Sequence, residues 1–398
     1  MQNMIHRIEI ENFGSIRERQ VIDLSVPATA PELERFPPSK ASERTRLPTV
    51  VAFFGPNASG KSTALRAAVA ARDFAVRSFE IGPEAVIPWF VPFRAGEWRS
   101  RPTRISIDFD APWIDETLHM HRYQLAIGHG EQAGVPVIHE SLSIKDGRRF
   151  RNLFLRKHQE IRCASELELP PSDARLKAVR ANASVISTMA QFNHEFFRRV
   201  QADVTYMLTN IAGHALFVPQ LQDALRFFVD HEEALKDLRE QLARLDVGIN
   251  DINIVETSSG LLASFTHEGL EESVHVLEES NGTRRFILLF PLLWYTLQTG
   301  RPAIIDEFDV DLHPMLIPEI LNWFQDPELN PHRAQLFLAA HNVSIMEHLE
   351  KEEIFLVEKA RDGASEITAL KDIRGVRREP SLQRKYLGGV FGAVPNIG

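Results

Sequence analysis

The alternation of apolar and polar residues predicts two strands at the start of the chain, at about residues 5–13 and 20–26, joined by a turn at Gly14-Ser15. Residues 49–54 are apolar without alternation, which is typical of a strand buried on both faces. That run leads into the loop GPNASGKST and then into a helix predicted over residues 61–72. A strand, a glycine-containing loop and a helix in this order indicate an α/β core.

The middle of the chain changes its periodicity twice. Between about residues 102 and 147, the segments RISIDFD, TLHMHRYQLAI and VIHESLSI alternate with period two and predict an antiparallel meander. From about residue 172 to residue 246 the pattern is helical. There Leu235, Leu238, Leu242 and Leu245 form one stripe. The stripe fits either an amphipathic helix packed on its own domain or a short helical arm that presents a partner or dimer surface.

The last third of the chain returns to mixed elements. We expect strands at INIVET, LASFTHE and SVHVLEE, a helix over residues 283–299, and a helix from about residue 314. Further strands are expected at residues 302–306, 335–340 and 354–358. This order predicts a nucleotide-binding core split by an insertion. Its segments are 1–109 (the N-terminal half), 110–170 (a β-rich insertion), 171–250 (a helical insertion or arm) and 251–398 (the C-terminal half).

Composition narrows the class of protein. The chain has 398 residues, of which 44% are hydrophobic, and this is typical of a globular protein. No run approaches the ~20 apolar residues of a membrane span, and the N-terminus lacks the apolar centre of a signal peptide. The single cysteine, Cys163, fits a reducing cytoplasm. We therefore expect a cytoplasmic protein that does not enter a membrane.

The net charge of −9 argues against nonspecific binding of duplex DNA. Two stretches are locally basic, residues 145–162 (KDGRRFRNLFLRKHQEIR) and residues 371–385 (KDIRGVRREPSLQRK). Each stretch could contact nucleic acid or an acidic partner, or could be a solvated face. Nucleic acid is therefore a possible partner, but not the favoured one.

The loop after the first buried strand matches the phosphate-binding pattern G-x-x-x-x-G-K-[ST], which would arise by chance in roughly one chain of this length in a hundred. Its backbone N–H groups and the helix N-terminus form an anion cradle. Lys61 would neutralise the β- and γ-phosphates of ATP, and the Ser62 hydroxyl would ligate Mg²⁺. The predicted phosphate-binding residues are Gly55, Pro56, Asn57, Ala58, Ser59, Gly60, Lys61, Ser62 and Thr63.

Two acidic residues follow a second buried strand, in the segment PAIIDEFDVDLHP. Asp306 and Glu307 would stand at the carboxyl end of this strand, which is where ligands bind in open α/β sheets. Asp306 is predicted to hold Mg²⁺. Glu307 is predicted to be the general base for the attacking water.

Two further segments carry polar groups at the ends of elements. Ser280-Asn281-Gly282 precedes the helix predicted from residue 283, where it either caps the helix or forms a second anion site. His341 follows the strand LFLAA and could hydrogen-bond a γ-phosphate, although a single histidine at a strand end is more often structural. Lys61 and Glu307 are therefore predicted catalytic residues, His341 is a third catalytic candidate, and Ser280 and Gly282 are candidate contacts to a phosphate.

These four motifs in this order resemble those of the ATP-binding-cassette (ABC) ATPases, specifically their SMC-like and RecF-like soluble branch. The resemblance implies a P-loop NTPase core of ABC type with N-terminal antiparallel strands, an inserted β-meander and a helical arm. It implies that Ser280 and Gly282 belong to the signature motif, which contacts ATP bound to the opposite protomer. Residues 308–313 would be the D-loop and His341 the switch histidine. The active unit would be a homodimer, or a higher even-numbered homo-oligomer, with ATP between subunits.

Several stretches resemble a narrower family, the AAA-type ATPases of prokaryotic abortive-infection and phage-defence operons (RloA/AbiL-like and PARIS AriA-like). They are IHRIEIENFGSIRERQVIDLS, GPNASGKST, ESNGTRRFI, IIDEFDVDLHP, AAHN and the ending RKYLGGVFGAVPNIG. The signature reads Ser-Asn-Gly-Thr where transporters have Ser-Gly-Gly-Gln. No Q-loop glutamine stands in the expected neighbourhood, VPFRAGEWRSRP, so other residues must couple the insertion to the nucleotide.

The narrower resemblance implies an ATPase that senses infection, through a trigger that could come from the phage, and controls a separate toxic effector of nuclease type encoded nearby. The residues after His341 read as elements that complete the core, so we expect no fused nuclease. The alternative is a RecF- or SMC-like DNA-repair ATPase that binds DNA in an ATP-dependent manner. A transporter subunit is disfavoured because the segment between Lys61 and Asp306 is much longer than such compact subunits carry.

Overall fold

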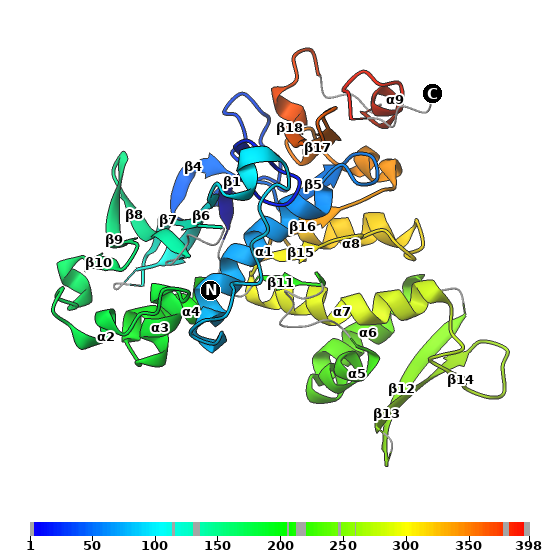
Figure 1. Ribbon diagram of the computed structural model, residues 1–398. Coiled ribbons are helices and arrows are strands. Elements are labelled where there is room, and N and C mark those ends of the chain that lie inside the picture. Colours follow the sequence, from blue (N-terminus) through cyan, green and yellow to red (C-terminus); the bar gives the residue numbers. More distant parts are fainter. Residues whose placement is uncertain are drawn as a thin grey trace.

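The computed structural model describes residues 4–113, 116–129, 136–204, 207–211, 220–245, 248–258, 260–376 and 382–393. Within these ranges the chain builds two large sheets, one of six strands and one of seven, with a long helix between them (Figure 1). The smaller sheets and the remaining helices lie around these two sheets, and the three-stranded sheet projects away from them. The predicted α/β core with N-terminal antiparallel strands is confirmed.

The six-stranded sheet is the core sheet. Its order is β11 (Leu208–Thr209), β15 (Ala303–Ile305), β16 (Leu336–Ala339), β5 (Val50–Phe54), β17 (Ile354–Lys359) and β18 (Ser365–Ala369). The first five strands pair in parallel, and β18 pairs antiparallel with β17. Every residue of β5 is buried. Val51 and Phe53 pack into one hydrophobic cluster, whereas Val50, Ala52 and Phe54 pack into another on the opposite face. Burial on both faces explains the continuous apolar run.

Helix α1 (Lys61–Arg77) leaves the carboxyl end of β5 and lies between the two large sheets (Figure 1). It extends five residues beyond the predicted end at Arg72. Its buried side includes the alanines at positions 64, 67, 68, 70 and 71, which belong to the cluster shared with β1 and β6. Small side chains let the helix backbone approach both sheets closely.

The seven-stranded sheet is antiparallel throughout. Its order is β10 (Glu160–Cys163), β9 (Arg149–Lys157), β8 (Val137–Asp146), β7 (Leu118–Ile127), β6 (Thr103–Pro112), β1 (Ile5–Glu11) and β2 (Gln20–Asp23). The predicted meander is therefore present, and through β6 it pairs directly with β1. The expected boundary between residues 109 and 110 falls inside β6, because the meander extends the N-terminal strands into one sheet.

The helical segment consists of α2 (Ala174–Lys177), α3 (Val185–Gln191), α4 (Glu195–Val204), α5 (Leu221–Asp230) and α6 (Glu232–Leu245). In α6, Leu238 and Leu242 are buried and Leu235 packs against the same cluster, which also contains residues of α5 and α7. The side chain of Leu245 lies outside the described residues. The leucine stripe is thus covered by the chain's own elements. Strand β11 interrupts the helices and joins the core sheet.

The C-terminal part adds β12 (Ile249–Thr257), β13 (Gly260–His267), β14 (Val274–His275), α7 (Asn281–Thr299), α8 (Leu316–Gln325) and α9 (Leu382–Leu387). The strand predicted at SVHVLEE is reduced to two residues, because the chain turns at residues 276–278. A small hairpin is formed by β3 (Pro38–Ser39) and β4 (Ser42–Arg46). Short 3₁₀ helices span Ser78–Glu80, Gly96–Arg99, Ser165–Leu167, Val343–His348 and Leu370–Asp372.

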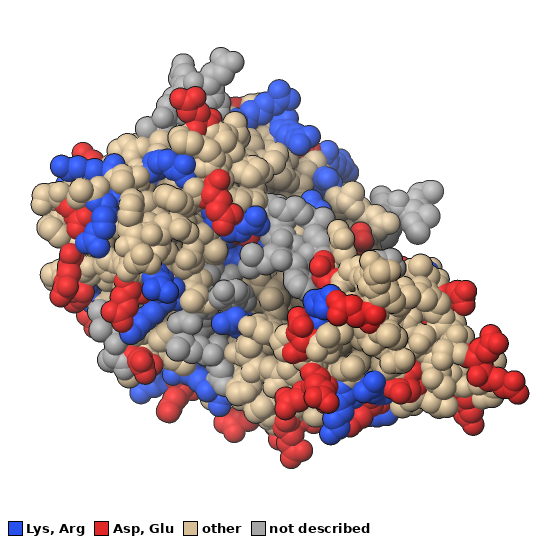
Figure 2. Space-filling view, turned by 90° about the horizontal axis from the view of Figure 1, so that it is seen from below, with Lys and Arg blue, Asp and Glu red and all other residues tan. Residues whose placement is uncertain are grey.

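The lobe that carries α5, α6 and β12–β14 has an acidic surface (Figure 2). Its described exposed carboxylates are Asp223, Asp230, Glu232, Glu233, Glu240, Asp251, Glu256, Glu268, Glu271, Glu272 and Glu278. Such a surface repels the phosphates of nucleic acid. None of the helices in the part of the chain that the structure describes is long and apolar enough to cross a membrane.

Candidate functional site

The loop between β5 and α1 packs so closely on its neighbours that two positions require glycine. A Cβ atom at Gly55 would lie 2.0 Å from the Val357 carbonyl oxygen of β17, and one at Gly60 would lie 2.2 Å from the Ser365 hydroxyl oxygen of β18. Both glycines also have positive φ angles, 155° and 116°. The β17–β18 hairpin therefore holds the loop in the conformation that a phosphate cradle needs.

Lys61 lies folded over this loop. Its Nζ atom donates to the carbonyl oxygens of Gly55 at 2.8 Å and Pro56 at 3.0 Å. Burial lowers the pKa of the Lys61 ammonium, and the nearby carboxylates of Asp306 and Asp309 oppose this shift. A buried cation that has only carbonyl partners is stabilised when an anion arrives. The Nζ atom of Lys61 therefore lies at the loop, and its role in phosphate binding stays a prediction.

Ser62 and Asp306 are brought together across 244 positions of sequence. The Ser62 hydroxyl donates to the Asp306 carboxylate at 2.9 Å. One hydroxyl oxygen and one carboxylate oxygen at the rim of a phosphate cradle are the kind of ligands that Mg²⁺ takes together with substrate phosphates. The hydroxyl of Ser59, in the loop itself, is buried and has no hydrogen-bond partner among the residues that the structure describes. These residues fit a magnesium-bound triphosphate.

Glu307 follows Asp306 and is exposed at the same edge of the sheet. Its φ angle is 51°, in the left-handed region that a glutamate rarely adopts. Strain of this kind is found at functional sites, where the surrounding structure maintains it. Here the backbone of Glu307 accepts a hydrogen bond from Arg285 of α7, at 3.4 Å. The predicted general base is thus held on a tight turn beside the predicted metal ligand.

His341 is attached to this turn through a residue that the sequence analysis did not single out. The carboxylate of Asp309 accepts the backbone N–H of His341 at 3.0 and 3.1 Å, and that of Asn342 at 2.5 Å. The His341 side chain itself is exposed. Asp309 therefore links the segment after β16 to the segment after β15. The available signal was a third acidic residue in DEFDVD, but no local pattern connects it to residue 341.

The segment Ser280–Gly282 sits against the segment after β15, not against the phosphate loop. The Ser280 hydroxyl accepts the backbone N–H of Thr283 at 3.0 Å and caps α7. A Cβ atom at Gly282 would lie 2.9 Å from the carbonyl oxygen of Asp311. The prediction that Ser280 caps the helix is confirmed. The close contact with Asp311 explains why position 282 is a glycine. A second anion site at this position stays a prediction.

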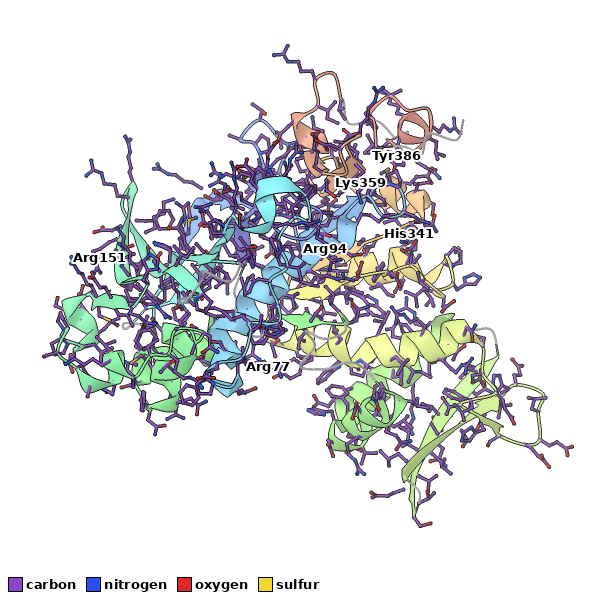
Figure 3. All side chains as sticks on the ribbon, in the orientation of Figure 1. Arg77, Arg94, Arg151, His341, Lys359 and Tyr386 are labelled. Atoms are coloured by element: carbon purple, nitrogen blue, oxygen red, sulfur yellow. The ribbon has the colours of Figure 1, made fainter. Side chains whose placement is uncertain are left out.

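Residues far from the motifs also contact the phosphate loop. The Ser15 hydroxyl, in the turn between β1 and β2, donates to the Thr63 hydroxyl at 3.1 Å and accepts from that of Ser365 at 2.8 Å. The Nζ atom of Lys359 donates to the Ala58 carbonyl oxygen at 3.1 Å. Figure 3 shows His341 and Lys359 on the same side of the core, with Arg151 at the opposite side. These contacts join the N-terminal turn and the C-terminal hairpin to the site.

Asn210 is a further contact that sequence reasoning missed. It follows β11, within the segment expected to be a helical insertion, and its side chain hydrogen-bonds the backbone of Asp306. Nothing in the local sequence marks this asparagine, because its partner is 96 positions away.

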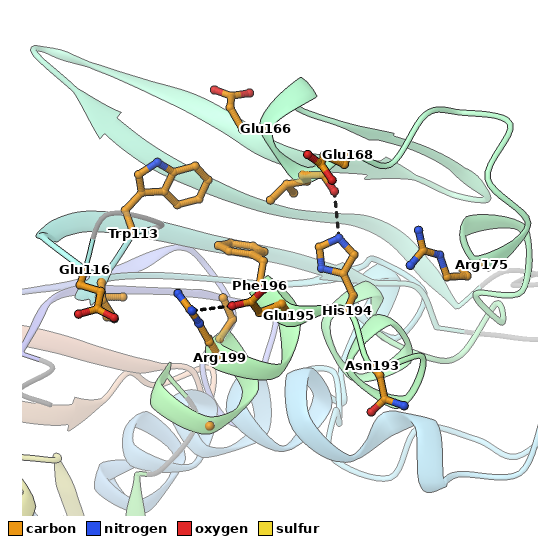
Figure 4. Close-up of a pocket in the computed structure, with 15 residues that line it drawn as sticks. Trp113, Glu116, Glu166, Glu168, Arg175, Asn193, His194, Glu195, Phe196 and Arg199 are labelled. Atoms are coloured by element: carbon orange, nitrogen blue, oxygen red, sulfur yellow. Dashed lines mark hydrogen bonds and ion pairs between the residues drawn. The ribbon is translucent and has the colours of Figure 1, made fainter.

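A separate cavity of about 700 Å³ lies between the end of β6 and α4 (Figure 4). Trp113 and Phe196 meet there edge to face, with ring centres 5.2 Å apart, and His194 hydrogen-bonds the Leu167 carbonyl oxygen at 2.9 Å. The described residues that line this cavity include none of the predicted nucleotide-site residues. The cavity is therefore distinct from the nucleotide edge.

The two basic stretches differ in which of their side chains are exposed and which are held by hydrogen bonds. Arg148, Arg149 and Arg151 are exposed at and beside the turn between β8 and β9, whereas Arg156 is fully buried. In the second stretch, Lys371 donates to two backbone carbonyls, at 2.6 and 2.7 Å, and burial lowers the pKa of its ammonium. Residues 377–381 lie outside the described residues. Arg374 and Arg384 of the second stretch are exposed as well, so described basic residues of both stretches reach the surface.

Comparison with solved structures finds head domains of SMC proteins. One is bound to the C-winged helix domain of ScpA (15% identity, covering 92% of this chain and 96% of that chain, TM-score 0.47). Another comes from Thermotoga maritima (14% identity, 93% and 99%, TM-score 0.42). A third, from Pyrococcus furiosus, carries an extended coiled coil and is bound to the C-terminal domain of ScpA (13% identity, 98% and 100%, TM-score 0.47).

No curated protein matches the chain by sequence. A family match, in contrast, covers residues 50–347, which is well over half of the chain and includes the phosphate loop, Ser280, Asp306, Glu307 and His341. On this match, the chain belongs to the family described as "AAA domain, putative AbiEii toxin, Type IV TA system".

Proposed function

We propose that the chain binds and hydrolyses ATP with Mg²⁺, and that it is the ATPase subunit of a bacterial anti-phage (abortive-infection) system of the RloA/AbiL-like or PARIS AriA-like kind. In this role it senses infection and controls a separate toxic effector of nuclease type. The observation that carries the ATPase part is the hydrogen bond between Ser62 and Asp306, which closes the predicted metal site beside the buried cation of Lys61.

The residues divide the chemistry between them. The loop N–H groups and Lys61 bind the phosphates, and Ser62 and Asp306 hold Mg²⁺, which neutralises charge on the phosphate oxygens when it is bound. Glu307, exposed at the end of β15, takes a proton from the attacking water. His341 hydrogen-bonds the γ-phosphate, and Asp309 holds its backbone in place.

The proposed active unit is a homodimer or a higher even-numbered homo-oligomer. Ser280 is exposed at the N-terminus of α7, and Gly282 is packed against Asp311 of its own D-loop. In this arrangement the signature segment and the D-loop of one chain are in direct contact. A second copy brings its exposed Ser280 to the nucleotide bound by the first copy, where the helix N-terminus favours a phosphate.

The test of this function is Glu307→Gln. We expect ATP binding to survive and hydrolysis to fall about 100- to 10,000-fold, because the water loses its base. ATP should therefore trap the oligomer, which light scattering detects. Glu328→Gln changes an exposed carboxylate after α8 and serves as the control. If ATP left the monomer population of Glu307→Gln unchanged, this result would contradict the proposed dimer with ATP between its subunits.

The effector is tested separately, by co-purification of the chain with the products of the adjacent genes. We expect a stable complex with one of them and no degradation of nucleic acid by the chain alone. Degradation of DNA or tRNA at stoichiometric amounts by the purified chain would contradict a separate effector.

A DNA-repair function of RecF or SMC type is the second candidate, and the exposed arginines at the β8–β9 turn favour it. A gel shift with duplex DNA at moderate salt, with and without ATP, discriminates the two functions. Tight ATP-dependent binding that is lost when Arg148, Arg149 and Arg151 are replaced together by Ala would support DNA repair. Weak binding that these substitutions leave unchanged would favour the defence function.

A further inference from the structure

Asn210 makes two hydrogen bonds to a single residue of the predicted magnesium site. Its Nδ2 atom donates to the backbone carbonyl oxygen of Asp306 at 2.8 Å, and its Oδ1 atom accepts the backbone N–H of Asp306 at 2.9 Å. One side-chain amide therefore satisfies both polar backbone groups of Asp306. We call such a pair of hydrogen bonds, from one side-chain amide to the backbone of one residue, a bracket. It restricts both backbone dihedral angles of that residue.

The position of Asp306 decides how two side chains of the site are presented. Asp306 follows β15 directly, and its carboxylate accepts the Ser62 hydroxyl. Glu307 comes next, on the left-handed turn. Any rotation of the Asp306 peptide groups would move the Asp306 carboxylate away from Ser62 and would change the direction in which Glu307 leaves the strand.

The segment that carries Asn210 is itself anchored on both sides. Strand β11 pairs with β15, and the backbone N–H of Leu208 donates to the Pro302 carbonyl oxygen at 3.0 Å. The Arg72 guanidinium of α1 donates to the Met207 carbonyl oxygen. The amide of Asn210 thus follows a short edge strand of the core sheet, and α1 contacts the residue just before this strand.

We propose that Asn210 is a positioning residue for the magnesium site: it holds Asp306 and Glu307 in register with Ser62 and couples residues 171–250 to the nucleotide. The inference rests on the proposed ATPase function and extends it. The sequence raised the question of which residue couples the insertion to the nucleotide, because the expected neighbourhood contains no Q-loop glutamine. The inference gives Asn210 as the answer. A side-chain amide reaches the site from a different part of the chain.

The coupling has a physical route. Helix α4 ends at Val204, three positions before Met207, and lines the cavity beside Trp113. A displacement of β11 along β15 changes the distance between Asn210 and Asp306 directly. Hydrogen bonds are short-ranged, so a shift of about 1 Å breaks the bracket and releases the Asp306 backbone.

The experiment compares Asn210→Ala and Asn210→Asp with Asn330→Ala. The control is matched, because Asn330 also brackets backbone groups: its amide bonds the Phe324 carbonyl and both polar groups of Ala334, away from the nucleotide edge. Asn210→Asp keeps the side-chain shape and the acceptor, but it loses the donor. Three quantities are measured: the melting temperature, the affinity for a fluorescent ATP analogue in EDTA, and the Mg²⁺ concentration needed for tight binding and for hydrolysis.

We expect both Asn210 variants to need about 10-fold more Mg²⁺ and to hydrolyse ATP at least about 10-fold more slowly, as is typical when a residue that orients a metal ligand is lost. Their affinity for the analogue in EDTA should stay within about 2-fold of the unmodified chain, since Lys61 and the loop are intact. Asn330→Ala should lower the melting temperature and leave the Mg²⁺ requirement unchanged.

A wild-type Mg²⁺ requirement in both Asn210 variants would overturn the proposal. So would an equal rise in Asn330→Ala, since the effect would then follow stability alone. If the unmodified chain does not hydrolyse ATP, the proposed function fails, and the ratio of nucleotide affinities with and without Mg²⁺ still tests Asn210. In that case an unchanged ratio in Asn210→Ala overturns the positioning role.

Discussion

Two clusters of polar residues in this molecule invite comparison, one at the edge of the core sheet and one inside the antiparallel sheet. At the core edge, Asp306 is half-buried, while Glu307 and His341 are exposed. In the antiparallel sheet, Glu140 and Arg156 are completely buried. Both clusters contain carboxylates and a cation. They differ in whether other groups of the chain supply hydrogen-bond partners for their polar atoms.

The buried cluster is satisfied from within. Glu140 accepts the hydroxyl of Ser184 at 2.6 Å, the N–H of Val185 at 2.9 Å and the hydroxyl of Tyr123 at 3.1 Å. The guanidinium of Arg156 lies 3.7 Å from Glu140 and donates to backbone carbonyl oxygens, including those of His158 and Ala183. Such a cluster fixes the packing of α3 on the sheet. It offers no free group to a ligand.

The core edge is arranged in the opposite way. Within the described ranges, Lys61 bonds only carbonyl oxygens of its own loop, the buried Ser59 hydroxyl has no hydrogen-bond partner, and Glu307 is exposed. Groups in this condition gain more from a ligand than groups that are already paired. The difference between the clusters separates a binding site from a structural network, and four substitutions test it.

The largest expected effect is the loss of nucleotide binding in Lys61→Ala. Removing the buried cation should weaken ATP binding by about 1000-fold or more, since charge-assisted bonds to phosphate are among the strongest in proteins. A titration with a fluorescent nucleotide measures the affinity. Lys157→Ala, which removes an exposed lysine of β9, is the control. An affinity within threefold of the unmodified chain would show that the core edge is structural.

The converse experiment is Glu140→Ala. It leaves Arg156 buried without its carboxylate, and we expect the free energy of unfolding to fall by about 3 to 5 kcal/mol. Urea denaturation measures this loss, and nucleotide affinity of the folded fraction should not change. Glu160→Ala, at an exposed carboxylate of β10, should have little effect. If Glu140→Ala altered nucleotide affinity at unchanged stability, the buried cluster would have a functional role and the comparison would break down.

Ser280→Arg sharpens the comparison by asking whether the exposed groups act between copies. ATP binding should persist, while hydrolysis falls by about 100-fold because a long cation replaces a hydroxyl that contacts the neighbour's nucleotide. Mixing Ser280→Arg with Lys61→Ala should restore part of the activity, because the mixed dimer regains one complete site. Ser273→Arg, at an exposed serine before β14, is the matched control. No recovery on mixing would argue that Ser280 acts within its own chain.

The smallest expected effect concerns Glu353, a buried carboxylate beside the core sheet with Arg35 at 3.3 Å and Gln325 at 3.3 Å. Burial raises the pKa of Glu353 from 4.5 to about 7, against the opposing effect of Arg35. Since the folded state holds this proton more tightly than the unfolded state, stability should decrease as the pH rises from 5 to above 7.

We expect this decrease to be about 2 kcal/mol and to be absent in Glu353→Gln. Denaturation at a series of pH values measures it. Parallel pH profiles for the two proteins would contradict the assignment of this decrease to Glu353.

The phosphate loop, the acidic strand end and their order could be predicted from sequence, because each depends on neighbours within a few positions. The same holds for the β-meander, whose alternating pattern needs only one buried face. The expected end of the first helix at Arg72 was too early, since residues 73–77 continue under tertiary contacts that local pattern does not contain. The leucine stripe of α6 left two interpretations open, and packing against α5 and α7 favours the first.

The sequence by itself determined the glycine-framed loop and the acidic pair at a strand end, because backbone conformation and side-chain chemistry at Gly55–Ser62 and Asp306-Glu307 are local properties. Only the tertiary structure decided which distant residues complete the site. Ser15, Asn210, Asp309 and Ser365 reach it through strand pairing and turns, and their hydrogen-bond partners lie between 32 and 350 positions away. A hydrogen bond depends on distance in space and leaves no periodic trace along the chain, so a sequence pattern cannot record it.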